Sequence, residues 1–231
     1  MHLQFQTSDL VPPPYAHAIE VHLNLLDDSL EIDFELTYLD REGLDPEEIV
    51  EEGFSDNDDL KWTGILNKDW LAYANELILS IDLIKKKELR SGEDFWHIET
   101  GNRKGYPLEN HLTSIFIQEI QQAAFEAAGR EATLNIKIER LSKENNVSHT
   151  FNASFKERTY CENKNGEKIK HSWNDLNTFL QDVFSGEFRP EQASKRSPNK
   201  SGLFLNIGDD LWYELGKSYL IQPSKIQKYL D

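Results

Sequence analysis

The alternation of apolar and polar residues is clearest at residues 18–39, AIEVHLNLLDDSLEIDFELTYL. Apolar residues recur at every second position on both sides of Asp27-Asp28, the pattern of two half-buried strands joined by a tight turn. One side of this predicted hairpin is apolar, with the cross-strand pairs Ile19 and Leu36, Val21 and Phe34, Leu23 and Ile32, and Leu25 and Leu30. The other side pairs Glu20 with Glu35, His22 with Asp33, and Asn24 with Glu31. Because a one-residue slip would mix the two faces, the pattern predicts this register.

Helical spacing marks three further segments of the first half. Residues 45–53, DPEEIVEEG, begin with an Asp-Pro start signal and stop at Gly53, which predicts a helix of one or two turns. Asn67 then caps a longer predicted helix with a stripe at Trp70, Ala74, Leu77, Ile81 and Ile84, followed by Lys85, Lys86 and Lys87. A strand is predicted at 95–100 and a glycine-rich turn at 101–107. Residues 108–128 predict a long helix whose inward positions are Leu112, Phe116, Ile120, Ala123 and Ala127.

The second half begins with another predicted hairpin, formed by residues 134–139 and 151–155. A short strand near Ile169 leads to a helix start at Ser172, which makes a capping box with Asp175. Residues 185–201 are polar, basic and proline-containing, which predicts a mobile loop. A third hairpin is expected around Gly208-Asp209, and Pro223 is expected to start a final short helix.

These elements predict an α+β fold in which antiparallel β-hairpins pack against several helices. Both halves run in the order hairpin, helix, strand or hairpin, and helix, although no matching residues establish a duplication. We therefore predict an acidic α+β half at residues 1–129 and a second α+β half at residues 130–231. The alternative is one continuous domain, since 231 residues suit either arrangement.

The net charge of −16 is unevenly distributed along the chain. Residues 1–84 contain 20 acidic and three basic residues, whereas residues 85–231 contain 21 acidic and 22 basic residues. Such a chain repels phosphate, and the basic stretch at Lys195, Arg196 and Lys200 is short and lacks interleaved aromatic residues, so no nucleic-acid partner is expected. A basic protein, or self-association of acidic segment with basic loop, is the expected type of partner.

No membrane partner is expected either, because the chain has no long apolar run and no lipidation signal. The amino terminus does not resemble an export signal, and the single cysteine, Cys161, permits no internal disulfide. Together these features predict a cytoplasmic location.

The familiar sequence motifs for catalysis and cofactor binding are incomplete or absent. GDDLWYELGKS at residues 208–218 ends like a phosphate-binding loop, but Leu211 stands where the motif needs its first glycine and a strand is expected to follow. The motifs G-x-S-x-G, H-E-x-x-H, C-x-x-C and G-x-G-x-x-G are absent. Cys161 is read as a small buried side chain rather than a nucleophile. We therefore expect no cofactor.

An acidic stretch at residues 47–62, EEIVEEGFSDNDDLKW, is the first candidate surface. It does not match a calcium-binding loop, because Leu60 and Lys61 occupy a ligand position and the glycine position. Loose cation binding by its aspartates and a solvated acidic loop stay open as alternatives. The predicted interaction surface consists of Glu47, Glu48, Glu51, Glu52, Phe54, Asp56, Asp58, Asp59 and Trp62, with Trp70 as a further aromatic anchor.

Two histidine groups form the second set of candidates. His22 lies among Glu20, Glu31, Asp33 and Glu35 on the polar side of the first hairpin, where it is expected to respond to pH or bind a transition metal. The alternative is an exposed strand surface that resists aggregation. His97 and Glu99 share one side of their predicted strand, near His111, Arg103 and Lys104, and they are candidates to line a pocket.

Two functional hypotheses follow. The first is a protein-interaction module, chaperone-like or inhibitor-like, that uses the acidic amino-terminal surface. The second is an enzyme or small-ligand-binding protein with a pocket between the two halves, lined by residues such as His97, Glu99, Trp62 or Tyr106. A salt-dependent association would favour the first, and a deep pocket with perturbed titratable groups would favour the second.

Overall fold

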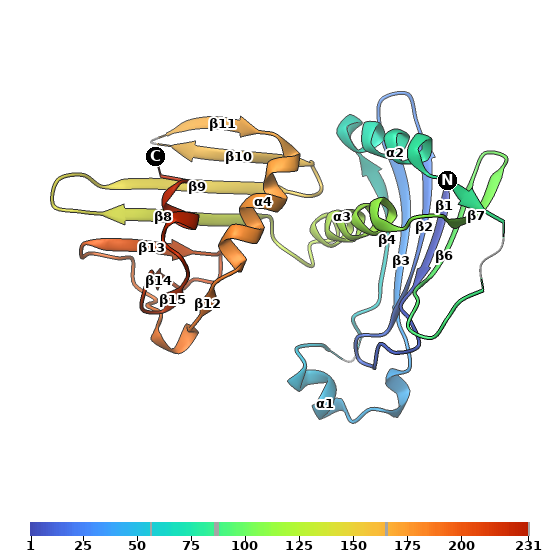
Figure 1. Cartoon of the computed structure of the whole chain (residues 1–231), viewed down its shortest axis with the longest axis horizontal. Helices are drawn as coiled ribbons and strands as arrows, with labels where there is room; N and C mark the ends of the chain where they lie inside the picture. Colours follow the sequence, from blue (N-terminus) through green and yellow to red (C-terminus); the bar gives the residue numbers. More distant parts are fainter. Residues whose placement is uncertain (56, 86–87, 165, 231) are drawn as a thin grey trace. The chain divides into compact units, whose positions relative to one another are not determined.

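The computed structural model describes residues 1–55, 57–85, 88–164 and 166–230. The chain forms two compact units, Met1–Ala128 and Gly129–Asp231 (Figure 1). Within the described residues, fifteen mostly antiparallel strands form three sheets and are accompanied by five α-helices. The α+β class predicted from the pattern is therefore confirmed. The structural similarity of the two halves stays a prediction.

A seven-stranded antiparallel sheet forms the centre of the first unit, in the order β4-β3-β2-β1-β6-β7-β5. The strands are β1 (His2–Gln6), β2 (His17–Leu25), β3 (Leu30–Tyr38), β4 (Leu60–Leu66), β5 (Leu83–Ile84), β6 (Phe95–Thr100) and β7 (Arg103–Pro107). The amino-terminal strand β1 lies between β2 and β6 and pairs with both over its whole length. It was not predicted, and it joins two hairpins that are distant in sequence.

The predicted register of the first hairpin is confirmed at every position. Strands β2 and β3 pair Ile19 with Leu36, His22 with Asp33 and Leu25 with Leu30. The apolar side of both strands is buried, and the polar side is open to solvent. The alternation thus determined which face of the sheet would enter the core.

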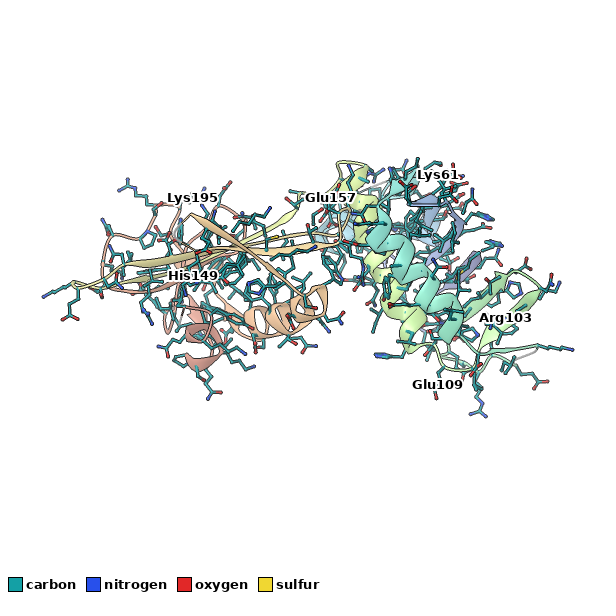
Figure 2. The ribbon with its side chains drawn as sticks, turned by 90° about the horizontal axis from the view of Figure 1, so that it is seen from above. Lys61, Arg103, Glu109, His149, Glu157 and Lys195 are labelled. Carbon is teal, nitrogen blue, oxygen red and sulfur yellow. The ribbon has the colours of Figure 1, made fainter. Side chains whose placement is uncertain are left out.

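Helices α2 (Lys68–Ser80) and α3 (His111–Ala127) cover the apolar face of this sheet (Figures 1 and 2). The Asn67 side chain accepts hydrogen bonds from the backbone of Asp69 and Trp70, as the predicted cap requires. Trp70 is 0% exposed and meets Phe116 of α3 edge to face, with 6.2 Å between the ring centroids. The short helix α1 (Pro46–Glu51) begins at the predicted Asp45 cap.

Two predictions about the helices of the first unit are wrong in detail. Helix α2 ends at Ser80, because Ile81 is extended and Leu83–Ile84 pair with β7. At the carboxyl end of this helix, the carbonyl groups of Ile78 and Ile81 accept hydrogen bonds from Arg103 of β7. Of the three lysines predicted at this end, Lys86 and Lys87 lie outside the described residues. Leu112 is 50% exposed rather than inward.

The predicted turn at residues 101–107 contains strand β7. Gly105 explains the error, because it adopts φ +150° and a Cβ there would lie 2.1 Å from the Ile84 carbonyl oxygen. The glycine therefore marks the close approach of β5 to β7 and not a turn.

The second unit contains a six-stranded sheet in the order β11-β10-β9-β8-β13-β14. Its strands are β8 (Leu134–Leu141), β9 (Val147–Ser154), β10 (Thr159–Lys164), β11 (Glu167–His171), β13 (Gly202–Asn206) and β14 (Tyr213–Glu214). Helices α4 (Trp173–Phe184) and α5 (Ser224–Gln227) pack on it, and a small sheet pairs β12 (Glu187–Phe188) with β15 (Tyr219–Leu220). The hairpins predicted at residues 134–155 and 202–214 are both present.

The segment at residues 185–201, predicted as a mobile loop, is partly regular. It contains β12 and a 3-10 helix at Pro190–Gln192, and the backbone of Ser194 exchanges two hydrogen bonds with Trp212. Phe188 stacks on the buried Tyr219 at 4.5 Å between ring centroids, so one half-buried aromatic side chain anchors a polar segment that composition alone assigns to a loop.

Candidate functional sites

The open face of the first sheet carries a line of polar side chains across five strands, β4, β3, β2, β1 and β6. Residues directly opposite each other in neighbouring strands share a face of the sheet. One row therefore runs Thr63, Asp33, His22, His2 and Glu99, and the adjacent row runs Lys61, Glu35, Glu20, Gln4 and His97. We call these two rows the histidine–carboxylate face.

Strand β1 brings the two histidine groups predicted from sequence onto this one face. His2 lies directly opposite His22 on one side and opposite Glu99 on the other. The sequence reasoning treated His22, Asp33 and Glu35 as separate from His97 and Glu99, and it missed His2. The alternation in HLQFQ was the available signal, but five residues at a chain end do not reveal which strands they join.

His2, Glu20 and His22 converge at the centre of the face. The Nε2 atom of His2 lies 2.7 Å from Oε1 of Glu20, and the Nε2 atom of His22 lies 3.4 Å from the same oxygen. The two imidazole rings stack with 4.1 Å between centroids and 9° between planes. An open hollow of about 530 Å³ adjoins them, lined also by Asp33, Thr63 and Glu99.

Other members of the face have local partners. Glu35 forms an ion pair of 2.7 Å with the exposed Lys61, and the hydrogen bond and charge of Glu35 raise the pKa of that lysine. The His97 ring meets Tyr106 edge to face at 6.1 Å between centroids. His111, predicted near His97, lines a separate hollow of about 610 Å³ together with Trp96 and Tyr106.

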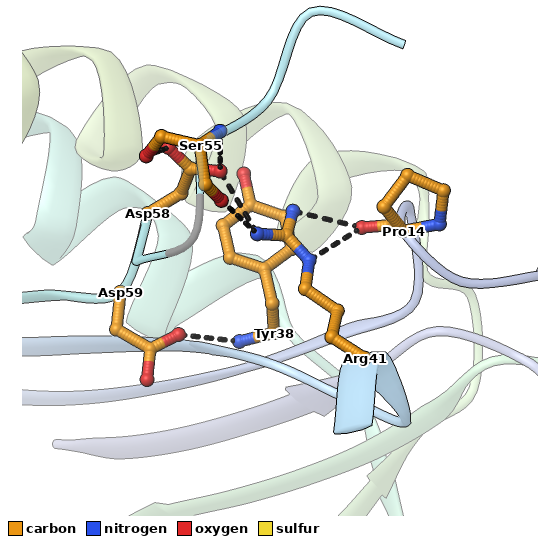
Figure 3. A network of polar contacts seen from close by, with 6 residues as sticks. All are labelled: Pro14, Tyr38, Arg41, Ser55, Asp58 and Asp59. Atoms are coloured by element: carbon orange, nitrogen blue, oxygen red, sulfur yellow. Dashed lines mark hydrogen bonds and ion pairs between the residues drawn. The ribbon is translucent and has the colours of Figure 1, made fainter. Parts of the chain in front are cut away.

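The acidic segment, residues 40–59, contains its own cation. Arg41 is the only lysine or arginine in the first 60 residues of the sequence. Its guanidinium donates to Asp58 at 2.8 Å, to the Ser55 carbonyl at 3.3 Å and, through Nε and Nη2, to the Pro14 carbonyl at 3.2 and 2.9 Å (Figure 3). The same group lies 3.7 Å from the centroid of the Tyr38 ring and 4.6 Å from that of Phe54.

Asp58 and Asp59 both accept hydrogen bonds from residues of the first unit. Burial disfavours the charged form of Asp58, but hydrogen bonds from Ser55 and Arg41 outweigh this effect and lower the pKa of the carboxyl group. Asp59 accepts a hydrogen bond of 2.8 Å from the backbone of Tyr38. Asp56, the third predicted aspartate, lies outside the described residues. The internal arginine supplies the cation that the Asp58 carboxylate contacts.

The remaining residues of the predicted interaction surface divide into two groups. Glu47, Glu48, Glu51 and Glu52 are exposed on or next to α1, and Glu52 accepts a hydrogen bond from the Tyr15 hydroxyl. Phe54 packs edge to face against Tyr15 and Tyr38, with 5.4 and 5.5 Å between centroids. The four acids are therefore exposed to solvent, and Glu52 contacts this aromatic cluster through Tyr15.

The predicted tryptophan anchors are placed differently. Trp62 lies in the apolar row of the sheet opposite Phe34, where its ring covers Gly64. It thus faces away from His97 and Glu99, with which it was predicted to line a pocket. Trp70 is 0% exposed in the core, which removes it as an anchor.

A second candidate site, not predicted from sequence, lies within the second unit. His149 is 1% exposed on β9, and its Nδ1 atom lies 2.7 Å from Oε1 of Glu162 on β10. The other oxygen of Glu162 lies 3.0 Å from Nε2 of His171. These groups line a hollow of about 390 Å³ together with aromatic residues of the sheet and helix, Phe151, Tyr160, Phe179 and Tyr229.

The polar groups of this hollow are incompletely satisfied. Among the described residues, neither ring nitrogen of His149 has a partner with hydrogen-bond geometry. The short contact of Nδ1 with Glu162 is therefore an electrostatic contact rather than a directed hydrogen bond. Burial, followed by the charges of Glu162 and Asp175, raises the pKa of Tyr160, which stays a neutral hydroxyl. Such a buried imidazole and carboxylate have the chemistry to hold or transfer a proton.

Comparisons with known proteins do not assign this chain to a family. No family model matches the chain, and neither a curated protein nor a solved structure matches it. Within the described ranges, no helix combines the length and the apolar composition needed to cross a membrane. The class that fold and sites define is a two-unit α+β protein with a histidine–carboxylate face on its acidic unit.

Proposed function

We propose that the protein is an interaction module, chaperone-like or inhibitor-like, whose acidic first unit binds a basic protein. The division of charge between the units carries this proposal. Residues 1–128 contain 27 acidic and nine basic residues, a net of −18, whereas residues 129–231 contain 14 acidic and 16 basic residues, a net of +2. A field of one sign on one unit attracts a partner of opposite charge and raises its association rate.

Apolar exposure supports the same unit as the docking surface. Among the described residues, the exposed large apolar side chains of the first unit are Leu10, Tyr15, Leu26, Val50, Ile65, Leu79, Leu89, Leu108 and Leu112. The second unit contributes only Phe184 to this set. Val50, 61% exposed, lies on α1 among the four glutamates, so that apolar contact and negative charge are available together there.

The cytoplasm is the proposed location of this interaction. The one cysteine of the sequence, Cys161, is a free and buried thiol. A single cysteine excludes any internal disulfide, which suits a reducing compartment.

A charge-neutralised variant tests the docking proposal. Changing Glu47, Glu48, Glu51 and Glu52 together to glutamine removes four negative charges from one exposed surface. We expect capture of basic proteins by the immobilised chain to fall at least about tenfold at low salt, and wild-type capture to fall steeply as salt rises. Quantitative pull-down over a salt series measures both effects.

The matched control removes four negative charges from the second unit. Glu131, Glu144, Glu157 and Glu167 are all exposed there, and their joint change to glutamine alters net charge equally. This control is expected to capture the same partners as the wild type. If the two variants behave alike, or if the α1 variant captures its partners as well as the wild type, the docking proposal is wrong.

The hollow of the second unit favours a second candidate function, the binding of a small ligand. A buried imidazole without a hydrogen-bond partner among the described residues weakens a fold, so its presence favours a role other than stability. We expect His149→Leu to leave the free energy of unfolding unchanged or to raise it by up to about 1 kcal/mol. Urea unfolding followed by circular dichroism measures this change. A loss above about 2 kcal/mol would assign His149 to the structure and remove this support.

A further inference from the structure

We propose that His2, Glu20 and His22 form a binding site for one divalent transition-metal ion of the zinc class on the histidine–carboxylate face. One ligand atom from each residue lies within 4.8 Å of the others. The site belongs to strands β1 and β2 and does not involve the glutamates of α1, so it stands apart from the docking surface proposed above.

The arrangement of donors suits such an ion. Both Nε2 atoms face the same carboxylate oxygen, at 2.7 and 3.4 Å. Zinc takes nitrogen and oxygen donors at roughly 2.0–2.2 Å, which places neighbouring donors of a tetrahedral ion about 3.4 Å apart. The two imidazole rings are nearly parallel, so side-chain rotations must turn both Nε2 lone pairs toward a common ion. The side chains of His22 and Glu20 are 54% and 44% exposed, which leaves room for those rotations.

The fold fixes the backbone positions of the three ligands. His2 and His22 are direct cross-strand neighbours, and Glu20 precedes His22 by two residues on the same face of β2. Strand β1 is hydrogen-bonded on both sides, to β2 and β6, and β2 is bonded to β1 and β3. Ligands on inner strands of a sheet are held more rigidly than ligands on loops.

The surrounding charge favours a dication. Glu99 lies directly across from His2, and Asp33 lies directly across from His22. The nearest lysine of the adjacent row, Lys61, is already in an ion pair with Glu35. Imidazole nitrogens select zinc, copper or nickel over calcium and magnesium, which prefer oxygen donors alone. The exposure of the site leaves its remaining coordination positions to water.

Calorimetric titration of the full chain with Zn²⁺, after removal of any purification tag and of trace metal, tests the site. We expect saturable binding of one ion per chain and no comparable binding of Mg²⁺. His22→Ala is expected to reduce Zn²⁺ affinity at least about tenfold, because even the loss of an outer partner of a ligand has an effect of that size. His97→Ala removes a histidine from the same face and is expected to change affinity less than about twofold, since it removes no ligand.

A second pair of variants separates coordination from charge. Glu20→Gln and Glu35→Gln each remove one negative charge from the same face, but only the first removes a proposed ligand. We expect at least about a tenfold loss of affinity for Glu20→Gln and less than about a threefold loss for Glu35→Gln. Circular dichroism of each variant checks that the fold is retained.

Two results would overturn the assignment. One is the absence of saturable Zn²⁺ binding by the wild type. The other is equal weakening by His22→Ala and His97→Ala, or by the two glutamine variants, which would mean nonspecific attraction to an acidic surface. Histidine ring signals in NMR spectra give an independent readout, because Zn²⁺ is expected to shift those of His2 and His22 and to leave that of His97 in place.

Discussion

Arg41→Met is expected to lower the free energy of unfolding by about 2–4 kcal/mol, because it removes the cation around which the acidic segment is organised. The Arg41 side chain is only 11% exposed and contacts Asp58, two backbone carbonyls and two aromatic rings. Methionine fills similar space but leaves the Asp58 carboxylate and both carbonyls without the guanidinium. Urea unfolding at pH 7 measures the change.

The stability at acidic pH provides a second test of the contact between Arg41 and Asp58. The pKa of Asp58 in the folded protein is lowered, so its ionised form contributes stability that is present above its unfolded pKa of about 4. That contribution is lost as the pH falls through the lower, folded pKa. In Arg41→Met the pKa of Asp58 is expected to rise, so the stability difference between variant and wild type should narrow below about pH 4.

Lys61→Met is the matched control for Arg41. Lys61 is also the basic partner of a carboxylate at 2.7 Å, but its side chain is 75% exposed. Surface ion pairs contribute little, so the expected change in stability is much smaller than that of Arg41→Met. A loss below about 1 kcal/mol for Arg41→Met, or an equal loss for the two variants, would contradict the organising role of Arg41.

Trp70→Ala is expected to lower the free energy of unfolding by about 3–5 kcal/mol. Trp70 is 0% exposed in the layer that α2 and α3 form on the apolar face of the first sheet, and its ring packs against Tyr73 and Phe116. Truncation removes apolar area from the core and leaves a cavity that the surrounding rings cannot fill completely. Urea unfolding followed by circular dichroism measures the effect.

Leu79→Ala on the same helix is the control for Trp70. Leu79 is 84% exposed, so its truncation is expected to change stability by less than about 0.5 kcal/mol. A Trp70→Ala loss below about 2 kcal/mol would mean that the helical layer can relax around the missing ring. The histidine–carboxylate face lies on the opposite side of the same sheet.

Local patterns predicted much of this fold. The hairpin of β2 and β3 follows from alternation alone, because only one register separates Ile19, Val21 and Leu23 from Glu20 and His22. The caps at Asp45, Asn67 and Ser172 follow from side chains that satisfy backbone donors only a few residues away. In both cases the interacting groups are neighbours in sequence, so the pattern contains the needed information.

Strands β1, β5 and β7 were not predicted, because their local sequence patterns contain too little information. Strand β5 contains only Leu83 and Ile84, and β7 contains Gly105 and ends at Pro107, so neither has an alternation of useful length. The pairing of β7 with β5 on one side and with β6 on the other depends on contacts across the sheet. Strand β1 pairs with residues 18–22 and 95–99, and no short window of sequence includes both partners.

By itself, the sequence determined which side of the first hairpin would be polar and that negative charge would gather in the amino-terminal part. Tertiary structure alone decided that His2 would lie beside His22, that the Arg41 guanidinium would contact Asp58 and the Pro14 carbonyl, and that His149, Glu162 and His171 would meet in one hollow. The physical reason is the sequence separation of the interacting residues. Periodicity and capping act over a few residues, whereas these sites are assembled by strand pairing and packing between distant segments.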